Sequence, residues 1–268
     1  MSTQVDLFTN VEPTSVSPDI AKPFVSRSTF YFGDCLVEMS KIADKSIDMI
    51  LCDLPYGTTS CKWDAVIPFD KLWQHYQRVI KDNGAIILTG YQPFTSLLVV
   101  SNLPLFKYAM VWDKVSKSDI MNAKNKPLRQ HEDILVFSKG TVANGSSRLM
   151  KYYPQGIEAG KRINRNNIQG EGATKSGRPS HSKVYAHSNS NYPTSIVKFS
   201  NADRTNILHP TQKPVPLFEY LIKTYTNEGE TVLDNCMGSG STGVACKKTG
   251  RHFIGIEKDE KYFEIAVS

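Results

Sequence analysis

The sequence has few features that could crosslink the chain. Its five cysteines are an odd number, and no two of them have the C-x-x-C spacing of a zinc knuckle. A disulfide framework and a structural metal site are therefore not expected, and we predict no metal ligands. Reduced, buried thiols are the simpler interpretation of these cysteines.

The chain also has no long hydrophobic run. No apolar stretch approaches membrane-spanning length, and the N-terminus lacks a charged start followed by an apolar segment. These absences argue against a membrane partner and favour a cytoplasmic protein. Acidic residues are the minority, since 26 Asp and Glu oppose 32 Lys and Arg for a net charge of +6. This excess favours a polyanionic partner only slightly, so the location of the charge matters more than its total.

What the chain does contain is an alternation of short strand and helix patterns. Residues 1–27 are rich in Ser, Thr and Pro and are expected to form a flexible arm. The clearest helix is 69–80, where apolar side chains recur on one face and Asn83-Gly84 is expected to end it. Strands are expected at 29–32, 47–52, 85–88, 108–112, 133–137, 231–233 and 252–256. This alternation predicts an α/β fold with a doubly wound, parallel, Rossmann-like sheet.

The stretch 139–205 differs from the rest. Between Lys139 and Asn206, 11 basic residues oppose 3 acidic ones, and tyrosine, asparagine and glycine are frequent. We interpret it as a basic insertion that binds nucleic acid and recognises a target, with a solvated flexible insertion as the alternative. The candidate DNA-binding residues are Arg148, Lys161, Arg162, Arg165, Lys175 and Arg178 here, and Lys114, Lys124, Lys126 and Arg129 between two predicted strands upstream.

The tetrapeptide Asp53-Leu54-Pro55-Tyr56 directly follows the predicted strand 47–52. It therefore lies at the carboxyl end of a buried strand, which is where open α/β sheets bind ligands. A turn or a helix cap would have the same residues, so the tetrapeptide alone does not identify a site.

A glycine-rich turn follows the predicted strand 231–233. It runs from Gly238 to Gly243, matches G-x-G-x-x-G, and is followed 19 residues after Gly238 by Glu257 at the end of the next strand. This spacing places an acidic group at the ribose of a nucleotide-containing cofactor. Only 25 residues follow Gly243, too few for the second half of a dinucleotide fold. The remaining strands must come from upstream, so we expect a circularly permuted sheet with the tetrapeptide half first and the cofactor half last.

Together these motifs resemble those of the β-class amino-group DNA methyltransferases. The tetrapeptide resembles their D-P-P-Y motif, Asp234 to Gly243 resembles their cofactor motif, and the segment 209–214 (HPTQKP) resembles the one that precedes it. The order of the motifs is also that of the β-class. The resemblance covers residues 28–138 and 206–268, the expected catalytic domain. One departure is Leu54, where the family has proline; the family uses the backbone carbonyl at this position, which leucine also provides.

The resemblance implies roles for individual residues. Asp at the first position of the tetrapeptide is typical of the adenine-N6 branch, whereas Ser there is typical of the cytosine-N4 branch. The implied catalytic residues are Asp53, Leu54, Pro55 and Tyr56. The residues implied to bind S-adenosylmethionine are Asp34, Cys35, Asp53, Thr211, Lys213, Asp234, Cys236, Gly238, Ser239, Gly240, Thr242, Glu257 and Lys258. For Lys213, covering the following helix is the alternative.

The implied reaction is transfer of a methyl group to the N6 amine of an adenine flipped out of duplex DNA at a specific sequence. Cytosine N4, RNA adenine and a protein amide are the alternative targets within the class. Two alternative functions lie outside the class of amino-group methyltransferases. One is a cofactor-binding DNA-recognition protein without catalysis, and the other is an NAD oxidoreductase. The latter leaves the tetrapeptide and the basic stretch unexplained. The resemblance further implies a bacterial, archaeal or phage enzyme of the restriction-modification type and favours a homodimer, whereas the existence of a cognate endonuclease is not readable from the chain.

Overall fold

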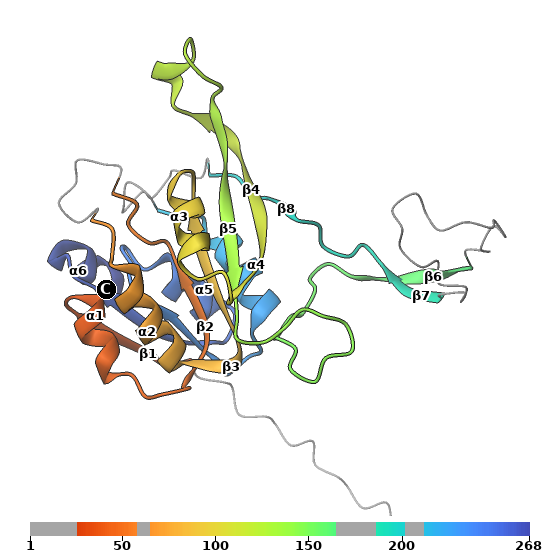
Figure 1. The fold of residues 1–268 in the computed structure, drawn as a ribbon, viewed down its shortest axis with the longest axis horizontal. Coiled ribbons are helices and arrows are strands. Elements are labelled where there is room, and N and C mark those ends of the chain that lie inside the picture. The colour runs from red at the N-terminus through yellow and green to blue at the C-terminus, as the bar shows by residue number, and fades with distance from the viewer. Residues whose placement is uncertain (1–25, 58–64, 165–185, 202–211) are drawn as a thin grey trace, which may run out of the picture.

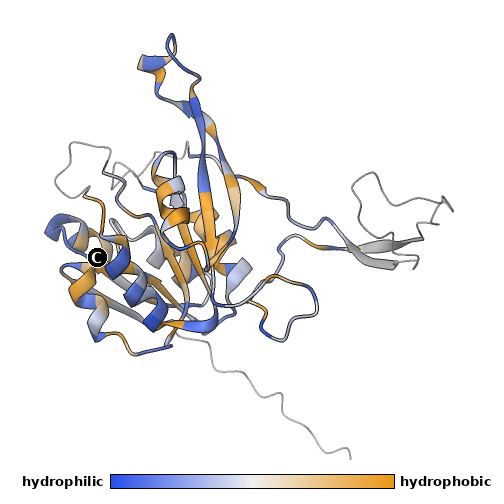
Figure 2. Cartoon of the chain, viewed as in Figure 1, coloured by the Kyte–Doolittle hydropathy of each residue, from blue (hydrophilic) through white to orange (hydrophobic). Residues whose placement is uncertain are grey.

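The central strands owe their position to their apolar sequences. A computed structural model describes residues 26–57, 65–164, 186–201 and 212–268. All six residues of β2 (Ile47–Cys52) are buried, as expected for a strand covered on both faces. Its side chains alternate, since Ile50 and Cys52 join one apolar cluster while Met49 and Leu51 join the other. The sheet therefore separates two hydrophobic cores (Figure 2).

Within the described ranges, eight strands form one mixed sheet (Figure 1). Their order is β1-β10-β9-β2-β3-β5-β4-β8, and only β5 runs antiparallel to its neighbours. Besides β2, the bounds are β1 Ser28–Phe32, β3 Ile80–Gly90, β4 Phe106–Ser118, β5 Arg129–Phe137, β8 Ile196–Lys198, β9 Thr231–Asp234 and β10 His252–Glu257. The expected α/β class is confirmed, with one antiparallel strand in place of an all-parallel sheet.

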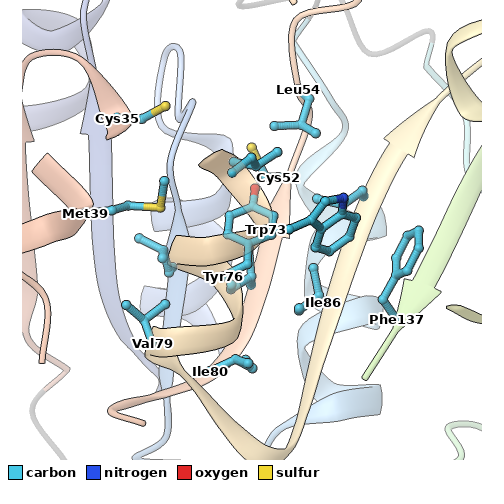
Figure 3. Close-up of a cluster of buried hydrophobic side chains, with 14 of the residues drawn as sticks. Cys35, Met39, Cys52, Leu54, Trp73, Tyr76, Val79, Ile80, Ile86 and Phe137 are labelled. Carbon is cyan, nitrogen blue, oxygen red and sulfur yellow. The ribbon is translucent and has the colours of Figure 1, made fainter. Parts of the chain in front are cut away.

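The helices cover both faces of this sheet. One core packs under α1 (Cys35–Glu38), the 3₁₀ turn η1 (Met39–Lys41), α2 (Phe69–Val79) and α3 (Phe94–Ser101). The other packs under α4 (Val215–Tyr225), α5 (Ser241–Lys248) and α6 (Glu260–Val267). Figure 3 shows the first core, with Trp73, Tyr76 and Val79 of α2 directed at the sheet. No helix in the described part of the chain is long and apolar enough to cross a membrane.

The expected stop of α2 at Asn83-Gly84 is wrong. The helix ends at Val79, and Ile80 already has extended backbone angles and begins β3. Ile80 is fully buried and pairs with Ile47 of β2, so packing against the sheet outweighs the helical pattern that includes it. Gly84 does not end a helix. A Cβ there would lie 2.7 Å from the Asp48 carbonyl oxygen, so glycine permits close approach of two strands.

The antiparallel strand β5 is the second correction. The strands β4 and β5 follow each other without a crossover helix and pair along most of their length, from Phe106 with Phe137 to Ser118 with Arg129. A direct connection reverses the chain, so one of the two strands must run antiparallel. Both strands are longer than the sequence pattern indicated, because their outer halves are polar. The turn between them carries the 3₁₀ element η2 (Ile120–Asn122) and extends away from the body of the protein (Figure 1).

The stretch 139–205 includes structure whose fold the sequence did not indicate. The strands β6 (Glu158–Asn164) and β7 (Ala186–Ser190) form a two-stranded antiparallel ribbon apart from the main sheet (Figure 1). In contrast, β8 pairs with β4 at the edge of the main sheet. Met150 and Val197 belong to the second core. Part of this basic stretch is therefore buried in the second core of the protein.

Asp48 connects three strands at the amino end of the sheet. Its side chain is 2% exposed and accepts hydrogen bonds from the ammonium groups of Lys81 and Lys151, each at 2.8 Å, and from the Thr231 N–H at 3.1 Å. Burial raises the pKa of Asp48, but the hydrogen bonds from Lys151 and Lys81 outweigh it and lower the pKa below 3.8. The carboxylate is therefore charged, and it joins β2 to β3, to β9 and to Lys151 outside the sheet.

We expect Asp48→Asn to lower the free energy of unfolding by about 3 kcal/mol, the low end of the range for breaking a buried ion pair, because Lys81 is partly exposed. Urea unfolding measures this difference. The matched control is Asp82→Asn, which breaks the exposed pair of Asp82 with Lys45 and should change stability little. Equal effects of the two substitutions would contradict the structural role of Asp48.

Candidate active site

The carboxyl ends of four neighbouring parallel strands meet at one edge of the sheet. There Asp34 follows β1, Asp53 follows β2, Asp234 ends β9 and Glu257 ends β10. The register places Phe32 of β1 beside Glu257, so these acids come together. They line one cavity of about 380 Å³, a size typical of small-molecule sites.

The Asp53 carboxylate lies at the centre of this cavity's hydrogen bonds. The hydroxyl groups of Tyr56 and Thr89 both donate to Oδ1, the latter at 2.6 Å. The Lys213 ammonium donates to Oδ2 and forms an ion pair with it. Burial, followed by the Asp53 and Glu132 carboxylates, raises the pKa of Tyr56 well above 10.0. The phenol is therefore neutral and able to donate, and the carboxylate is oriented by donors from three parts of the chain.

The side chain of Leu54 differs from its neighbours in direction. It is 3% exposed and belongs to the first core, where Figure 3 shows it near Cys52. Because residue 54 also lines the cavity, its burial anchors the tetrapeptide while leaving backbone at the cavity wall. Apolar packing here replaces the rigidity that a proline ring would supply.

The Tyr56 ring is held by other aromatic side chains. Its centroid lies 5.2 Å from that of Tyr91 in an edge-to-face arrangement and 5.0 Å from that of Phe94. The Arg129 guanidinium carbon in turn lies over the Tyr91 ring, 4.0 Å from the ring centroid. These contacts restrict rotation of the Tyr56 ring at the cavity wall.

Charged side chains from β4 and β5 complete this side of the cavity. Lys213 has a second carboxylate neighbour, Glu132, whose Oε2 lies 3.5 Å from its ammonium nitrogen. The Lys114 ammonium pairs with Glu132 Oε1 at 3.1 Å. Burial lowers the pKa of Lys213, but the Asp53 and Glu132 carboxylates outweigh burial and raise that pKa above 10.5. The cavity wall thus carries two ammonium groups and two carboxylates.

The glycine-rich turn forms the opposite wall. Gly238 and Gly240 have φ values of 52° and 88°, which favour glycine. The Gly238 N–H donates to Glu257 Oε2 at 2.8 Å, and the N–H groups of Lys258 and Asp259 donate to Oε1, each at 2.9 Å. Oε1 is filled by its two donors, whereas Oε2 accepts only one, so Glu257 is fixed in place and Oε2 is still able to accept from a ligand.

Asp234 lies beneath the same turn. Its side chain is 3% exposed; Thr242 donates to Oδ2 at 2.5 Å and the Cys236 N–H donates to Oδ1 at 3.1 Å. Burial raises the pKa of Asp234 from 3.8 to about 6, although both donors act in the opposite direction. A cation bound next to Asp234 would lower this pKa again, which is the behaviour expected of an acid that meets a cationic ligand group.

The thiols of Cys35 and Cys236 line the cavity near these acids, whereas Cys52 and Cys246 are fully buried in the two cores. Cys35, Cys52, Cys236 and Cys246 are free, and Cys61 lies outside the described residues. Burial raises the pKa of Cys52 to about 12, and hydrogen bonding with Cys236 together with burial raises the pKa of Cys35. These thiols are therefore protonated and serve as small apolar packing groups.

Most residues that the sequence indicated for the site do line the cavity. All four tetrapeptide residues do so. Of the expected cofactor residues, ten more line it: Asp34, Cys35, Lys213, Asp234, Cys236, Gly238, Ser239, Thr242, Glu257 and Lys258. Gly240 is not in the lining; it is the N-cap of α5. A Cβ added at Gly240 would lie 3.1 Å from the Ala266 Cβ, so glycine is favoured there. Thr211 lies outside the described residues.

The expected DNA-binding residues are spread more widely. Lys114 and Arg129 line the cavity, whereas Lys124 and Lys126 lie in the turn between β4 and β5. Arg148 lines a separate hollow with Lys45, Lys81 and Lys139, near the start of β3 and away from the cavity. The strand β6, which carries Lys161 and Arg162, belongs to the separate ribbon. Arg165, Lys175 and Arg178 lie outside the described residues.

Several cavity residues were not expected from the sequence. Thr89 bonds Asp53 from the residue before the last of β3, and the rule that ligands bind at carboxyl ends of strands could have indicated it. Glu132 could not be found this way, because it lies near the amino end of the antiparallel strand β5. Trp112 and Tyr262 also line the cavity without a sequence motif.

The fold and the site define a class of protein. A mixed α/β sheet with one antiparallel strand carries a glycine turn, an acid at the next strand end and an Asp-led tetrapeptide at the same edge. This combination is that of a methyltransferase acting on an amino group. The family profile of DNA methylases named N6_N4_Mtase matches residues 47–268. The chain belongs to this family, which confirms the resemblance seen in its motifs.

Individual relatives agree. The type II methyltransferase M.HpaI of Haemophilus parainfluenzae is 28% identical over 248 residues, which cover 87% of this chain and 71% of M.HpaI. Among solved structures, the PvuII DNA methyltransferase (cytosine-N4-specific) superposes with a TM-score of 0.64 at 16% identity over 90% of this chain and 86% of its own. The structure of the M1.HpyAVI complex with S-adenosylmethionine superposes with a TM-score of 0.56 at 23% identity. The match covers 90% of this chain and 98% of M1.HpyAVI. The protein is therefore a DNA methyltransferase of this amino-group family.

The raised pKa of Asp234 gives a testable pH dependence. The folded state holds its proton up to about pH 6, whereas the unfolded state releases it near 3.8. This group therefore stabilises the fold at low pH, and the contribution is lost as pH rises through about 6. Relative to Asp234→Asn, the wild-type free energy of unfolding should fall by about 2 kcal/mol between pH 4 and pH 7. Urea unfolding across this range measures it, and a constant difference would contradict the raised pKa.

Proposed function

We propose that the protein methylates the N6 amine of adenine in duplex DNA at a specific sequence. The observation that carries this proposal is the position of Asp53 and Leu54 at the end of β2, in one cavity with the glycine turn and Glu257. Asp at the first tetrapeptide position supports adenine, as the resemblance implies. The solved PvuII relative is cytosine-N4-specific, but at 16% identity it supports the fold alone.

The chemistry requires acceptors aimed at the target amine. The lone pair of an exocyclic amine is delocalised into the base, so the amine is a poor nucleophile. The Asp53 carboxylate and the Leu54 carbonyl would accept its two hydrogens and favour a pyramidal nitrogen with an available lone pair. These acceptors bind more strongly as positive charge develops on nitrogen, which stabilises the transition state more than the ground state. Asp53 also provides an acceptor for the proton that the methylated nitrogen must lose.

The Tyr56 ring would stack on the target base. A base inside a duplex cannot reach the Asp53 carboxylate, because that carboxylate is 20% exposed and lies within the cavity. The base must therefore leave the helix, at a cost of a few kcal/mol. The rigid surroundings of Tyr56 favour this exchange, since stacking is regained without ordering a mobile side chain.

The cavity also fits the cofactor. S-adenosylmethionine supplies an electrophilic methyl group on a cationic sulfur, and it carries ribose hydroxyls, an adenine and a charged amino-acid part. Asp34 presents an acceptor for the adenine and Glu257 one for the ribose at adjacent strand ends, and Asp234 presents one for the cationic amino group. The backbone of the turn at Gly238 can approach closely because it has no Cβ. This set of acceptors matches a cationic, hydroxyl-rich ligand.

We infer two DNA-facing regions from the charge and shape of the surface. The turn between β4 and β5 carries Lys124 and Lys126, and the strands lead directly to Lys114 and Arg129 in the cavity. Phosphate contacts there would place the target base over the cavity. The stretch 139–205, with the β6–β7 ribbon, is the proposed target-recognition insertion between the catalytic parts 28–138 and 206–268; residues 1–27 would be an arm.

Further proposals concern organisation. The chain ends with β9 and β10, yet these strands lie between β1 and β2, which supports a circularly permuted methyltransferase sheet. A homodimer stays a prediction from the resemblance, and a cytoplasmic location stays a prediction from the sequence. Size-exclusion chromatography with light scattering would decide the oligomeric state.

The product of the reaction tests the proposed target. The protein is incubated with labelled S-adenosylmethionine and unmethylated duplex DNA, and the DNA is digested to nucleosides for mass spectrometry. We expect N6-methyladenine. N4-methylcytosine would overturn the base assignment, and label in RNA but not in DNA would overturn the substrate.

Asp53→Ala tests the mechanism. We expect the rate of methyl transfer to fall by roughly 10²- to 10³-fold or more, because an acceptor of the transition state is lost. Calorimetry should show that S-adenosylmethionine still binds, since Asp34, Asp234 and Glu257 are unchanged. Retained turnover in this variant would refute the role of Asp53.

A further inference from the structure

Lys213 lies between two carboxylates and is held firmly at one of them. Its side chain is 8% exposed, and its ammonium group donates to Asp53 Oδ2. The second carboxylate, Glu132, has one oxygen 3.5 Å away. Lys213 directly precedes Pro214, the N-cap of α4, so its backbone is anchored to a buried helix.

In this position Lys213 obstructs the proposed reaction. Its ammonium group lies over the Tyr56 ring, 6.0 Å from the centroid, where the target base would stack. It also occupies the oxygen of Asp53 that Tyr56 and Thr89 leave open. A positive charge there would repel the positive charge that develops on the amine nitrogen. Productive binding of the base therefore requires the ammonium to leave Asp53.

Glu132 offers the place to which it can move. Glu132 Oε1 is paired with Lys114 at 3.1 Å, whereas Oε2 is buried and has no hydrogen-bond partner in the described part of the protein. A buried carboxylate oxygen without a hydrogen bond is costly. A shift of Lys213 by about 0.6 Å toward Oε2 would form a hydrogen bond to Glu132, and further movement in the same direction would break the bond to Asp53.

We propose that Glu132 is a positioning residue that takes Lys213 from Asp53 when the target base enters. In the empty protein, Lys213 neutralises Asp53. When the base enters, Lys213 moves onto Glu132 Oε2, and Asp53 accepts the amine hydrogen in its place. The two ammonium groups and two carboxylates stay in the cavity throughout, so no charge is buried without a partner. This inference rests on the proposed function, because it assigns Asp53 to the target amine.

Glu132→Gln tests the transfer of Lys213. Glutamine keeps the shape and one acceptor but loses the charge, so Lys213 should stay on Asp53. The single-turnover rate of methyl transfer is measured at saturating S-adenosylmethionine on a duplex whose recognition sequence is first identified by sequencing methylated DNA. We expect a rate at least threefold below wild type, with the Kd for S-adenosylmethionine unchanged. The matched control is Asp133→Asn, the adjacent carboxylate of β5, which bonds Thr95 and does not line the cavity; its rate should equal the wild-type rate.

A double variant separates this role from a purely structural one. If Lys213 held on Asp53 causes the loss, removing its charge should relieve it. We therefore expect Glu132→Gln combined with Lys213→Met to be at least threefold faster than Glu132→Gln alone, a coupling that a double-mutant cycle detects. Fluorescence of a duplex with 2-aminopurine at the target adenine reports entry of the base independently of transfer. Its increase on binding should be smaller in Glu132→Gln and restored in the double variant.

The proposal is overturned if the rate of methyl transfer in Glu132→Gln falls by less than threefold. It is also overturned if the double variant is not at least threefold faster than Glu132→Gln. Thermal unfolding checks that the variants are folded. If Glu132→Gln does not fold, Glu132→Asp replaces it with the same thresholds, because it keeps a charge for Lys114 but is one methylene shorter toward Lys213. Failure of the proposed function is distinguishable, since Asp53→Ala would then retain activity.

Discussion

The Asp53 carboxylate is the interaction on which the site depends. It collects donors from three distant parts of the chain, namely Tyr56 after β2, Thr89 at the end of β3, and Lys213 before α4. Each donor is itself held by packing, so the carboxylate has one orientation. The donors Tyr56 and Thr89 on Oδ1 keep the carboxylate oriented while Lys213 exchanges with the target amine at Oδ2, which is the preorganisation that an amine-activating acceptor requires.

This arrangement is possible because neighbouring strands are parallel. Parallel strands that begin at one edge of a sheet end together at the other, so β1, β2, β9 and β10 deliver their terminal acids to one cavity. The antiparallel strand β5 adds what parallel strands cannot. It brings Glu132 from the amino end of a strand to the same edge, where it faces Lys213. The tetrapeptide and the charged residue Glu132, which the sequence did not indicate, therefore line the same cavity.

Most elements could be predicted from the sequence where a periodic pattern coincided with a strong breaker or motif. β2 was predicted residue for residue, since its apolar run ends at the tetrapeptide. The end of α2 was not, because Ile80 fits the helical stripe and is taken by the sheet only through pairing with Ile47. The outer halves of β4 and β5 were missed for a related reason. Their residues are polar, and the pairing of two strands stabilises them without an apolar pattern.

The sequence by itself determined the class of protein and the two motifs of the site, because each motif is a local series of residues at a strand end. It also indicated ten of the cofactor residues beyond the tetrapeptide that line the cavity. Only the tertiary structure decided which charges meet there. Lys213 was expected at the cofactor, yet it lies on Asp53, 160 residues away in the chain, with Glu132 beside it. Such contacts depend on how strands and helices pack in three dimensions, and no local pattern of residues encodes them.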